Sequence, residues 1–95
     1  MSVPHMLVHD NKDTVGVVTV EGLKAGTNML CVVTADNSAF HLISKMDVPI
    51  GHKIALVDIK KGDTVLKYGQ DIGCAIDDIG KGEHVHVHNL KTKRW

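Results

Sequence analysis

Glycine interrupts this sequence so often that only short regular elements fit between the turns. Nine of the 95 residues are glycine, and the apolar segments that separate them are rich in valine and isoleucine. These β-branched residues favour strands, and turn-forming residues bound each segment. The sequence therefore predicts short strands at six places: residues 5–9, 14–20, 28–34, 53–58, 64–67 and 72–76.

Helical periodicity is weak along the whole chain. The best candidate for a helix is the short segment 38–46, where Phe40, Ile43 and Met46 recur at every third position. A chain of this length forms one small domain and hardly more. We therefore predict a mostly β fold with little helix, organised as a single domain spanning residues 1–95.

One short pattern occurs three times, in residues 22–29, 58–65 and 78–85. Each copy has an aliphatic residue, two further residues, a glycine, two polar residues and then an apolar residue. The pattern indicates a turn that needs a positive φ angle at its glycine, followed by entry into a strand. The copies are irregularly spaced, so they indicate a reused turn and not a solenoid. Independent glycine turns of a β protein would look much the same.

The composition disfavours several classes of function. Eleven basic and eleven acidic residues leave no formal net charge, which argues against an electrostatic grip on nucleic acid or on an anionic membrane. Three aromatic residues are too few for base stacking, and no apolar stretch is long enough to span a bilayer. Two cysteines outside any CxxC motif, with no visible signal peptide, predict a cytoplasmic protein with reduced thiols.

Three of the seven histidines stand at alternate positions in the segment GEHVHVHN, residues 82–89. On a strand, His84, His86 and His88 would share one face. Neighbours on one face of a strand lie roughly 6.6–6.8 Å apart along the chain, and the outer two of these histidines would be about 13 Å apart. Two adjacent imidazoles can therefore reach one metal ion, but all three cannot easily do so.

The histidine segment thus predicts a metal corner made of two imidazoles, either His84 with His86 or His86 with His88. Its remaining ligands must come from elsewhere in the chain, and His52 and Asp71 are candidates. The alternative is a solvated face that carries neutral imidazoles.

The segment PIGHKIAL, residues 49–56, would present polar side chains at the end of a turn. Pro49 fixes φ and Gly51 permits a tight bend, so His52 and Lys53 project from the turn. The lysine supplies a positive charge suited to a carboxylate or a sulfonate. An ordinary surface hairpin is the alternative interpretation.

The segment KYGQDIGCAI, residues 67–76, has two glycines flanking QDI, which indicates a bend or a bulge. Lys67, Tyr68 and Asp71 could line this bend, although the signal is weak in isolation. The sequence contains none of the stronger catalytic motifs, such as GxSxG, a Walker A loop or HExxH.

Three segments, read in order, resemble the small N-terminal module of the altronate and galactarate dehydratase family: IGHKIALVDIKKGDTVLKYGQDIGCAI, DIGKGEHVHVHN and KTKRW. In the sugar-acid dehydratases this module is joined to a large catalytic region. Because the present sequence stops after the module, it is similar to the small subunits of sulfo-lyases, whose large subunit is a separate polypeptide. The resemblance implies a mostly β domain of the SAF, or β-clip, type with long hairpins, its core at about 9–90 and a basic tail at 91–95.

The resemblance also implies a reaction, the elimination of a group β to the carboxylate of a hydroxy acid. Water leaves in the dehydratases, whereas sulfite leaves in the sulfo-lyases, which convert (2R)-3-sulfolactate to pyruvate. A base must take the proton next to the carboxylate, and the resulting enolate needs positive charge nearby. Family members depend on a divalent metal that meets this need, so we expect Fe²⁺, held by this chain or mainly by the large subunit.

On this interpretation the chain contributes three groups of residues. The catalytic candidates are His86 and His52, and the metal-ligand candidates are His84, His86 and His88. The substrate-binding candidates are Lys53, Lys67, Tyr68 and Asp71. The expected partners are a large catalytic subunit and a small anionic hydroxy acid, with no nucleic acid and no membrane.

Other functions are compatible with the same residues. The chain could serve an altronate- or galactarate-type dehydratase, or it could be a sugar-acid-binding module without catalysis. The histidines could also form a free-standing metal or pH sensor. The presence of a large partner subunit separates the lyase from the last two alternatives.

Overall fold

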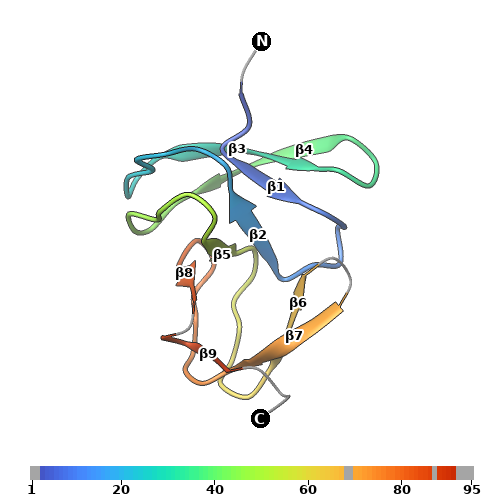
Figure 1. The fold of residues 1–95 in the computed structure, drawn as a ribbon, viewed down its shortest axis with the longest axis vertical. Coiled ribbons are helices and arrows are strands. Elements are labelled where there is room, and N and C mark those ends of the chain that lie inside the picture. The colour runs from blue at the N-terminus through green and yellow to red at the C-terminus, as the bar shows by residue number, and fades with distance from the viewer. Residues whose placement is uncertain (1–2, 68–69, 87, 92–95) are drawn as a thin grey trace.

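The computed structural model describes residues 3–67, 70–86 and 88–91. These residues form strands and turns with no helix (Figure 1), and the prediction of a mostly β domain is confirmed. The strands are β1 (Met6–Val8), β2 (Val15–Val18), β3 (Asn28–Val33), β4 (Ser38–Ile43), β5 (Lys53–Ala55), β6 (Thr64–Lys67), β7 (Gln70–Ala75), β8 (His84–Val85) and β9 (Leu90–Lys91).

The predicted helical segment 38–46 is wrong, because most of it forms strand β4. This strand pairs with β3 along its whole length, from Asn28 opposite Ile43 to Val33 opposite Ser38. The three-residue spacing of apolar side chains does not mark one buried face, since Ile43 is 57% exposed and the buried residue is Leu42. Pairing with β3 in a hairpin therefore overrides a weak helical signal.

The strands form two sheets. The larger one has the order β4-β3-β1-β2-β5-β8, and the smaller one has the order β6-β7-β9. Only β1 and β3 pair in parallel among the described strands. In Figure 1 the smaller sheet lies below β2 and β5, at the far end of the molecule from the β3–β4 hairpin. No described segment is a helix long and apolar enough to cross a membrane.

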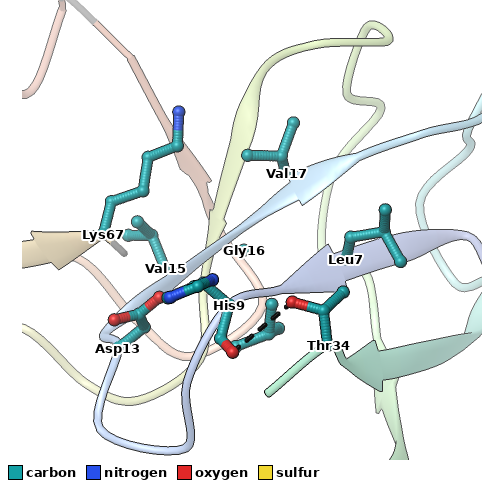
Figure 2. A pocket seen from close by; sticks show the side chains of 9 residues that line it. Leu7, His9, Asp13, Val15, Gly16, Val17, Thr34 and Lys67 are labelled. Carbon is teal, nitrogen blue, oxygen red and sulfur yellow. Dashed lines mark hydrogen bonds between the residues drawn. The ribbon is translucent and has the colours of Figure 1, made fainter. Parts of the chain in front are cut away.

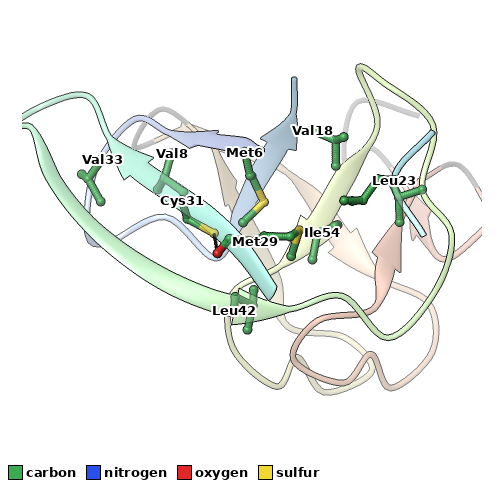
Figure 3. Packing of buried hydrophobic residues seen from close by; sticks show 10 residues of the cluster. Met6, Val8, Val18, Leu23, Met29, Cys31, Val33, Leu42 and Ile54 are labelled. Carbon is green, nitrogen blue, oxygen red and sulfur yellow. Dashed lines mark hydrogen bonds between the residues drawn. The ribbon is translucent and has the colours of Figure 1, made fainter. Parts of the chain in front are cut away.

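Two aliphatic cores fill the space around these sheets. The first contains Met6, Val8, Val18, Leu23, Met29, Cys31, Val33, Leu42, Val48 and Ile54, most of which are labelled in Figure 3. The second lies between the two sheets and contains Val15, Ala55, Ile59, Val65, Ala75, Ile79 and Val85. Burial raises the pKa of the Cys31 thiol to about 11, so this thiol stays protonated and unreactive at neutral pH.

Strand β2 contributes to both cores because its side chains alternate between the two faces of the sheet. Val15 belongs to the second core and Val18 to the first. Between them, Gly16 faces the first core, and a Cβ atom there would lie 2.7 Å from Sδ of Met6. A side chain at this position would therefore displace the side chains of Met6 and Val8 on β1, so close packing and not the φ angle favours glycine here.

The repeated glycine turn predicted from the sequence is present in all three copies. Gly26, Gly62 and Gly82 have φ angles of 88°, 89° and 89°, in the region that residues with a Cβ rarely adopt. In each copy the residue after the glycine donates its N–H to the carbonyl three positions earlier, which closes the turn: Thr27 to Lys24, Asp63 to Lys60 and Glu83 to Gly80.

An aspartate caps each of these turns, which the sequence analysis did not anticipate. The N–H of the residue before the glycine donates to an aspartate Oδ1 at 2.8 Å in every copy: Ala25 to Asp47, Lys61 to Asp78 and Lys81 to Asp58. The last two caps are reciprocal, because each aspartate precedes the isoleucine that begins the other turn. Those isoleucines, Ile59 and Ile79, pair with each other as an antiparallel bridge.

Candidate functional site: a cluster of histidines

His52 is presented by the predicted turn at residues 49–52. The turn closes with a 3.2 Å hydrogen bond from the His52 N–H to the Pro49 carbonyl, and Gly51 has a φ of 84°. Two further bonds attach this turn to β2, since Gly51 donates to the Val18 carbonyl and Val18 donates to the His52 carbonyl. The half-buried His52 ring therefore projects from a well-anchored backbone.

The strand predicted through His84, His86 and His88 is wrong beyond its second residue. Strand β8 contains only His84 and Val85, which pair with β5. The chain then turns, because the N–H groups of Asn89 and Leu90 both donate to the His86 carbonyl, at 3.0 and 2.9 Å.

The turn changes where the last of the three histidines lies. A continuous strand would separate the outer two side chains by about 13 Å. Instead, the exposed His88 returns toward His84, and their ring centroids are 5.0 Å apart.

The rings of His52, His84 and His86 are in mutual contact. Nδ1 of His52 lies 2.8 Å from Nε2 of His84, and the His52 and His86 rings are stacked, with centroids 3.8 Å apart and planes 17° apart. The centroids of His84 and His86 are 5.8 Å apart. The register of β5 with β8 explains this contact, because Ile54 lies opposite His84, and continuing the pairing by two residues places His52 beside His86.

The environment of His84 and His86 favours neutral imidazole. Burial lowers the pKa of His84, and the charges of His88, His52 and His86 lower it further. The pKa of His86 is lowered first by desolvation and then by His52, Lys53 and His88. A neutral imidazole carries one nitrogen lone pair, which can accept a proton or bind a metal ion.

The geometry of the cluster is compatible with a shared metal ion. Each of His52, His84 and His86 offers a ring nitrogen, and these three atoms lie within 4.8 Å of one another. Imidazoles on one tetrahedral ion with bonds of about 2.1 Å would hold their nitrogens roughly 3.4 Å apart. Neutral imidazole suits iron and zinc, so the donor set fits a divalent transition metal. Because a bound ion lies in the plane of each ring that holds it, the stacked His52 and His86 rings would have to tilt to share one.

The structure thus brings His52, and not Asp71, to the paired histidines. Within the described part of the chain, Asp71 does not belong to the group of side chains that could hold one ion. Its exposed carboxylate accepts the N–H of Gly73 at 2.9 Å, beside the β-bulge between β6 and β7 that the sequence predicted. The assignment of Asp71 to substrate binding remains a prediction.

The two candidate lysines act on each other electrostatically. Lys53 points to the opposite face of β5 from His52 and Ile54, and its pKa is lowered by burial and then by the positive charge of Lys67. Lys53 in turn contributes to the lowered pKa of His86. The two lysines therefore create a region of positive potential that extends to His86, and such a region attracts small anions.

Lys67 also lines a small pocket on the outer side of β1 and β2. Figure 2 shows its side chain above Val15, with the His9 ring directed at the carboxylate of Asp13. The cavity measures about 40 Å³, which is the size of one water molecule. In the chain alone, this cavity therefore offers room for no more than a water molecule beside Lys67.

Two residues of the cluster's surroundings were not found by sequence reasoning. Met46 lies beside β8, and its Sδ is 3.4 Å from the N–H of His84. Asn89 bonds to the backbone of the histidine segment through its side chain. Its place at the end of GEHVHVHN and the turn preference of asparagine were the available signals. Tyr68 and the tail at 92–95 lie outside the described residues.

Comparison with known proteins places the fold in a family. Residues 4–93 match the model of the altronate/galactarate dehydratase SAF domain. The chain belongs to this family. The predicted SAF-type domain is thereby confirmed, and the match covers all the histidines of the cluster.

Some relatives are covered almost completely by this chain, whereas others are much longer proteins. The (2R)-sulfolactate sulfo-lyase subunit alpha of Paracoccus pantotrophus is 63% identical over 67 residues, which are 70% of this chain and 100% of the relative. The subunit of the same name in Chromohalobacter salexigens is 48% identical over 94% of this chain and 95% of the relative. Altronate dehydratase of Escherichia coli is 47% identical over 75 residues, which are 79% of this chain and only 14% of that protein.

Proposed function

We propose that this chain is the small subunit of a lyase that eliminates sulfite from (2R)-3-sulfolactate, and that it completes the active site of a separate large subunit. The observation that carries the proposal is the 63% and 48% identity to two sulfo-lyase alpha subunits over nearly their whole lengths. The three half-buried imidazoles in contact could supply a base or metal ligands to such an active site.

The reaction needs a base and a stabilised anion. A base removes the proton from the carbon that carries the hydroxyl and carboxylate groups, the bond between the neighbouring carbon and sulfur breaks, and sulfite leaves with the electron pair. The remaining enol becomes pyruvate by moving its hydroxyl proton to carbon. A neutral imidazole is suited to the first step, and the lowered pKa values of His84 and His86 keep these rings neutral.

We assign His86 and His52 as the candidates for the base. His84, His86 and His88 are the candidate ligands of a divalent ion, expected to be Fe²⁺, and the contacts add His52 to that set. When bound, such an ion supplies positive charge to the carboxylate and to the developing enolate. A ring nitrogen that holds a metal cannot also take a proton, so His86 fills only one of its two candidate roles at a time.

Lys53 and Lys67 are suited to the charge of the substrate. Sulfolactate carries a carboxylate and a sulfonate. The two ammonium groups repel each other in the free chain, and a dianion bound between them would reduce this repulsion. The lowered pKa of Lys53 reflects that repulsion together with its burial. Tyr68 and Asp71 remain further candidates for substrate contacts.

The test is to coexpress the chain with its large subunit and to measure sulfite release from (2R)-3-sulfolactate. Alanine variants of His52, His84, His86 and His88 are compared with His41→Ala, which removes an exposed histidine on β4. Loss of a base should lower kcat by about 100- to 10,000-fold, and loss of a ligand should lower the bound iron. Unchanged turnover and iron content in all four variants would refute the proposal.

The second candidate is a small subunit of a sugar-acid dehydratase, favoured by the 47% identity to altronate dehydratase. The same purified complex distinguishes the two, because a dehydratase would release water from altronate and leave sulfolactate intact. If the complex binds sugar acids without turnover of either substrate, a non-catalytic binding module is the better description.

A further inference from the structure

We propose that Asn89 is the positioning residue of the histidine cluster, holding the backbone of the histidine segment so that its rings meet His52. The structural part of this inference stands on hydrogen bonds alone. Its catalytic consequence rests on the proposed function. Asn89 is one of few buried polar residues in the described chain, with 9% of its surface exposed.

The side-chain amide of Asn89 bonds to the backbone of two of the cluster's histidines. The N–H of His86 donates to Oδ1 at 2.9 Å, and Nδ2 donates to the carbonyl of His84 at 2.8 Å. A backbone N–H can only donate and a carbonyl can only accept, so the amide has one possible orientation. Both bonds are part-buried, where a missing partner is costly.

Asn89 is itself fixed to the rest of the fold. Its N–H donates to the His86 carbonyl, and its carbonyl accepts the N–H of Ile76, each at 3.0 Å. The next residue, Leu90, begins β9 and pairs with Ala75 of β7. The position of the amide is therefore set by the smaller sheet, while His52 is anchored to β2 of the larger sheet.

These bonds are made where the strand ends. The N–H of His86 donates to Asn89, and the chain turns after Val85, so that His88 approaches His84. The Asn89 amide holds His84 and His86 relative to each other, which supports the 3.8 Å stacking of His86 on His52.

Asparagine is the residue type that meets both demands at this length. Aspartate keeps an acceptor for His86 but sets a carboxylate oxygen against the carbonyl of His84. Leucine has nearly the same shape and offers neither bond. Two variants, Asn89→Asp and Asn89→Leu, therefore remove one bond or both with little change in volume.

A matched control is Thr14→Val. The Thr14 hydroxyl also makes two bonds to backbone, both with Leu66: it accepts the N–H at 2.8 Å and donates to the carbonyl at 3.4 Å. Thr14 belongs to none of the candidate catalytic or binding groups. It thus controls for the loss of a comparable side-chain clamp outside the cluster.

The first measurement is NMR of the full 95-residue chain, following the imidazole signals and the contacts between ring protons. We expect Thr14→Val to leave them as in the wild type. Asn89→Leu should remove the contacts between the rings of His52 and His86. Asn89→Asp should shift the His84 ring signals more than those of His86, because only the bond to the His84 carbonyl is lost.

The second measurement is kinetics of the assembled complex. Disturbing groups that hold a metal ligand in place typically lowers activity by about 10- to 100-fold, and we expect this for kcat in Asn89→Leu with KM within about twofold of wild type. If Asn89→Leu does not fold, Asn89→Asp decides. Wild-type ring contacts and wild-type kcat in the folded Asn89 variants would overturn the inference.

The two proposals can fail separately. If Asn89 variants disturb the rings while His52→Ala and His86→Ala retain full turnover, Asn89 positions the cluster but the proposed catalytic role is wrong. If the histidine variants lose turnover while the Asn89 variants keep both ring contacts and kcat, the cluster is catalytic and Asn89 does not position it.

Discussion

Two segments of this protein begin alike and end differently. Residues 59–67 and 79–86 each start with a buried isoleucine, turn at a glycine with a φ of 89° and place a fully buried valine three residues after that glycine. The first then continues as β6 to Lys67. The second ends its strand at Val85 and turns. Histidines flank the buried valine in this segment, whereas Thr64 and Leu66 flank it in the first.

The comparison separates what makes the fold from what makes the site. The glycine turn, its aspartate cap and the buried valine are shared, so they serve the second core and the joining of the two sheets. His84 and His86 occur only in the second segment, and Asn89 follows it directly in the turn after β8. The candidate histidine cluster thus follows one copy of the turn, whereas the copy at 59–67 continues as a regular strand that ends at Lys67.

The largest expected effect on stability comes from the two glycines. A Cβ at Gly82 would lie 2.6 Å from the carbonyl oxygen of Ile43, whereas a Cβ at Gly62 meets nothing within 4 Å. Both have positive φ, which costs about 1–2 kcal/mol for alanine, and the backbone clash adds about 1–3 kcal/mol at Gly82. Urea unfolding should show Gly82→Ala to be the more destabilised variant. Equal losses of unfolding free energy in the two variants would mean that the close contact between Gly82 and the Ile43 carbonyl does not affect stability.

The buried valines should respond equally. Val65 and Val85 both have no exposed surface and belong to the same core, so truncation to alanine should lower the free energy of unfolding by about 2 kcal/mol in each case. Only Val85→Ala, which lies between His84 and His86, should also alter the imidazole signals in an NMR spectrum. A change of those signals in Val65→Ala would contradict the claim that only the second segment supports the histidine cluster.

The reciprocal aspartates allow a finer test. Asp58 caps the turn at Lys81, just before the histidines, and Asp78 caps the turn at Lys61. Replacing either by alanine should cost about 1 kcal/mol, as for other side-chain caps, measured by urea unfolding. Metal binding by the histidines, followed with added Fe²⁺ under anaerobic conditions, should weaken in Asp58→Ala more than in Asp78→Ala. The opposite order would contradict the assignment of the caps to separate turns.

The smallest effect is the pH dependence of stability. The pKa values of His84 and His86 are lowered in the folded chain, so the unfolded chain binds more protons as the pH falls through their range. Their contribution to stability is therefore complete above the unfolded value of about 6.5 and is lost as the pH falls through the lower folded values. The double variant His84→Gln with His86→Gln should flatten the melting temperature between pH 7 and 5. An unchanged dependence of the melting temperature on pH would mean that other groups cause it.

Much of the fold could be predicted because its signals are local. The six expected strands all occur, although most are shorter than the apolar segments that indicated them. The three glycine turns follow from a conformational preference that belongs to glycine alone. The segment 38–46 was considered a candidate helix because a three-residue spacing of apolar side chains carries no information about its hairpin pairing with β3, which runs from Val33 opposite Ser38 to Asn28 opposite Ile43.

The candidate site was only partly predictable. His52 could be proposed as a partner of the paired histidines, but so could Asp71, since spacing in sequence does not tell which loop reaches the segment. The register of β5 with β8 makes that choice. The approach of His88 to His84 was not foreseen, because alternation alone predicted a straight strand. The strand ends at Val85 instead, and Asn89 bonds to the backbone of the turn that follows.

The sequence alone determined the fold class, the glycine turns and the supply of imidazoles, because each of these depends on the intrinsic properties of residues and their near neighbours. The tertiary structure decided which histidines touch, which lysines share a positive field and where the last strand stops. Those features depend on hydrogen bonds and strand pairing between segments far apart in the chain, such as β5 with β8 and Asn89 with β7, and no local pattern encodes them.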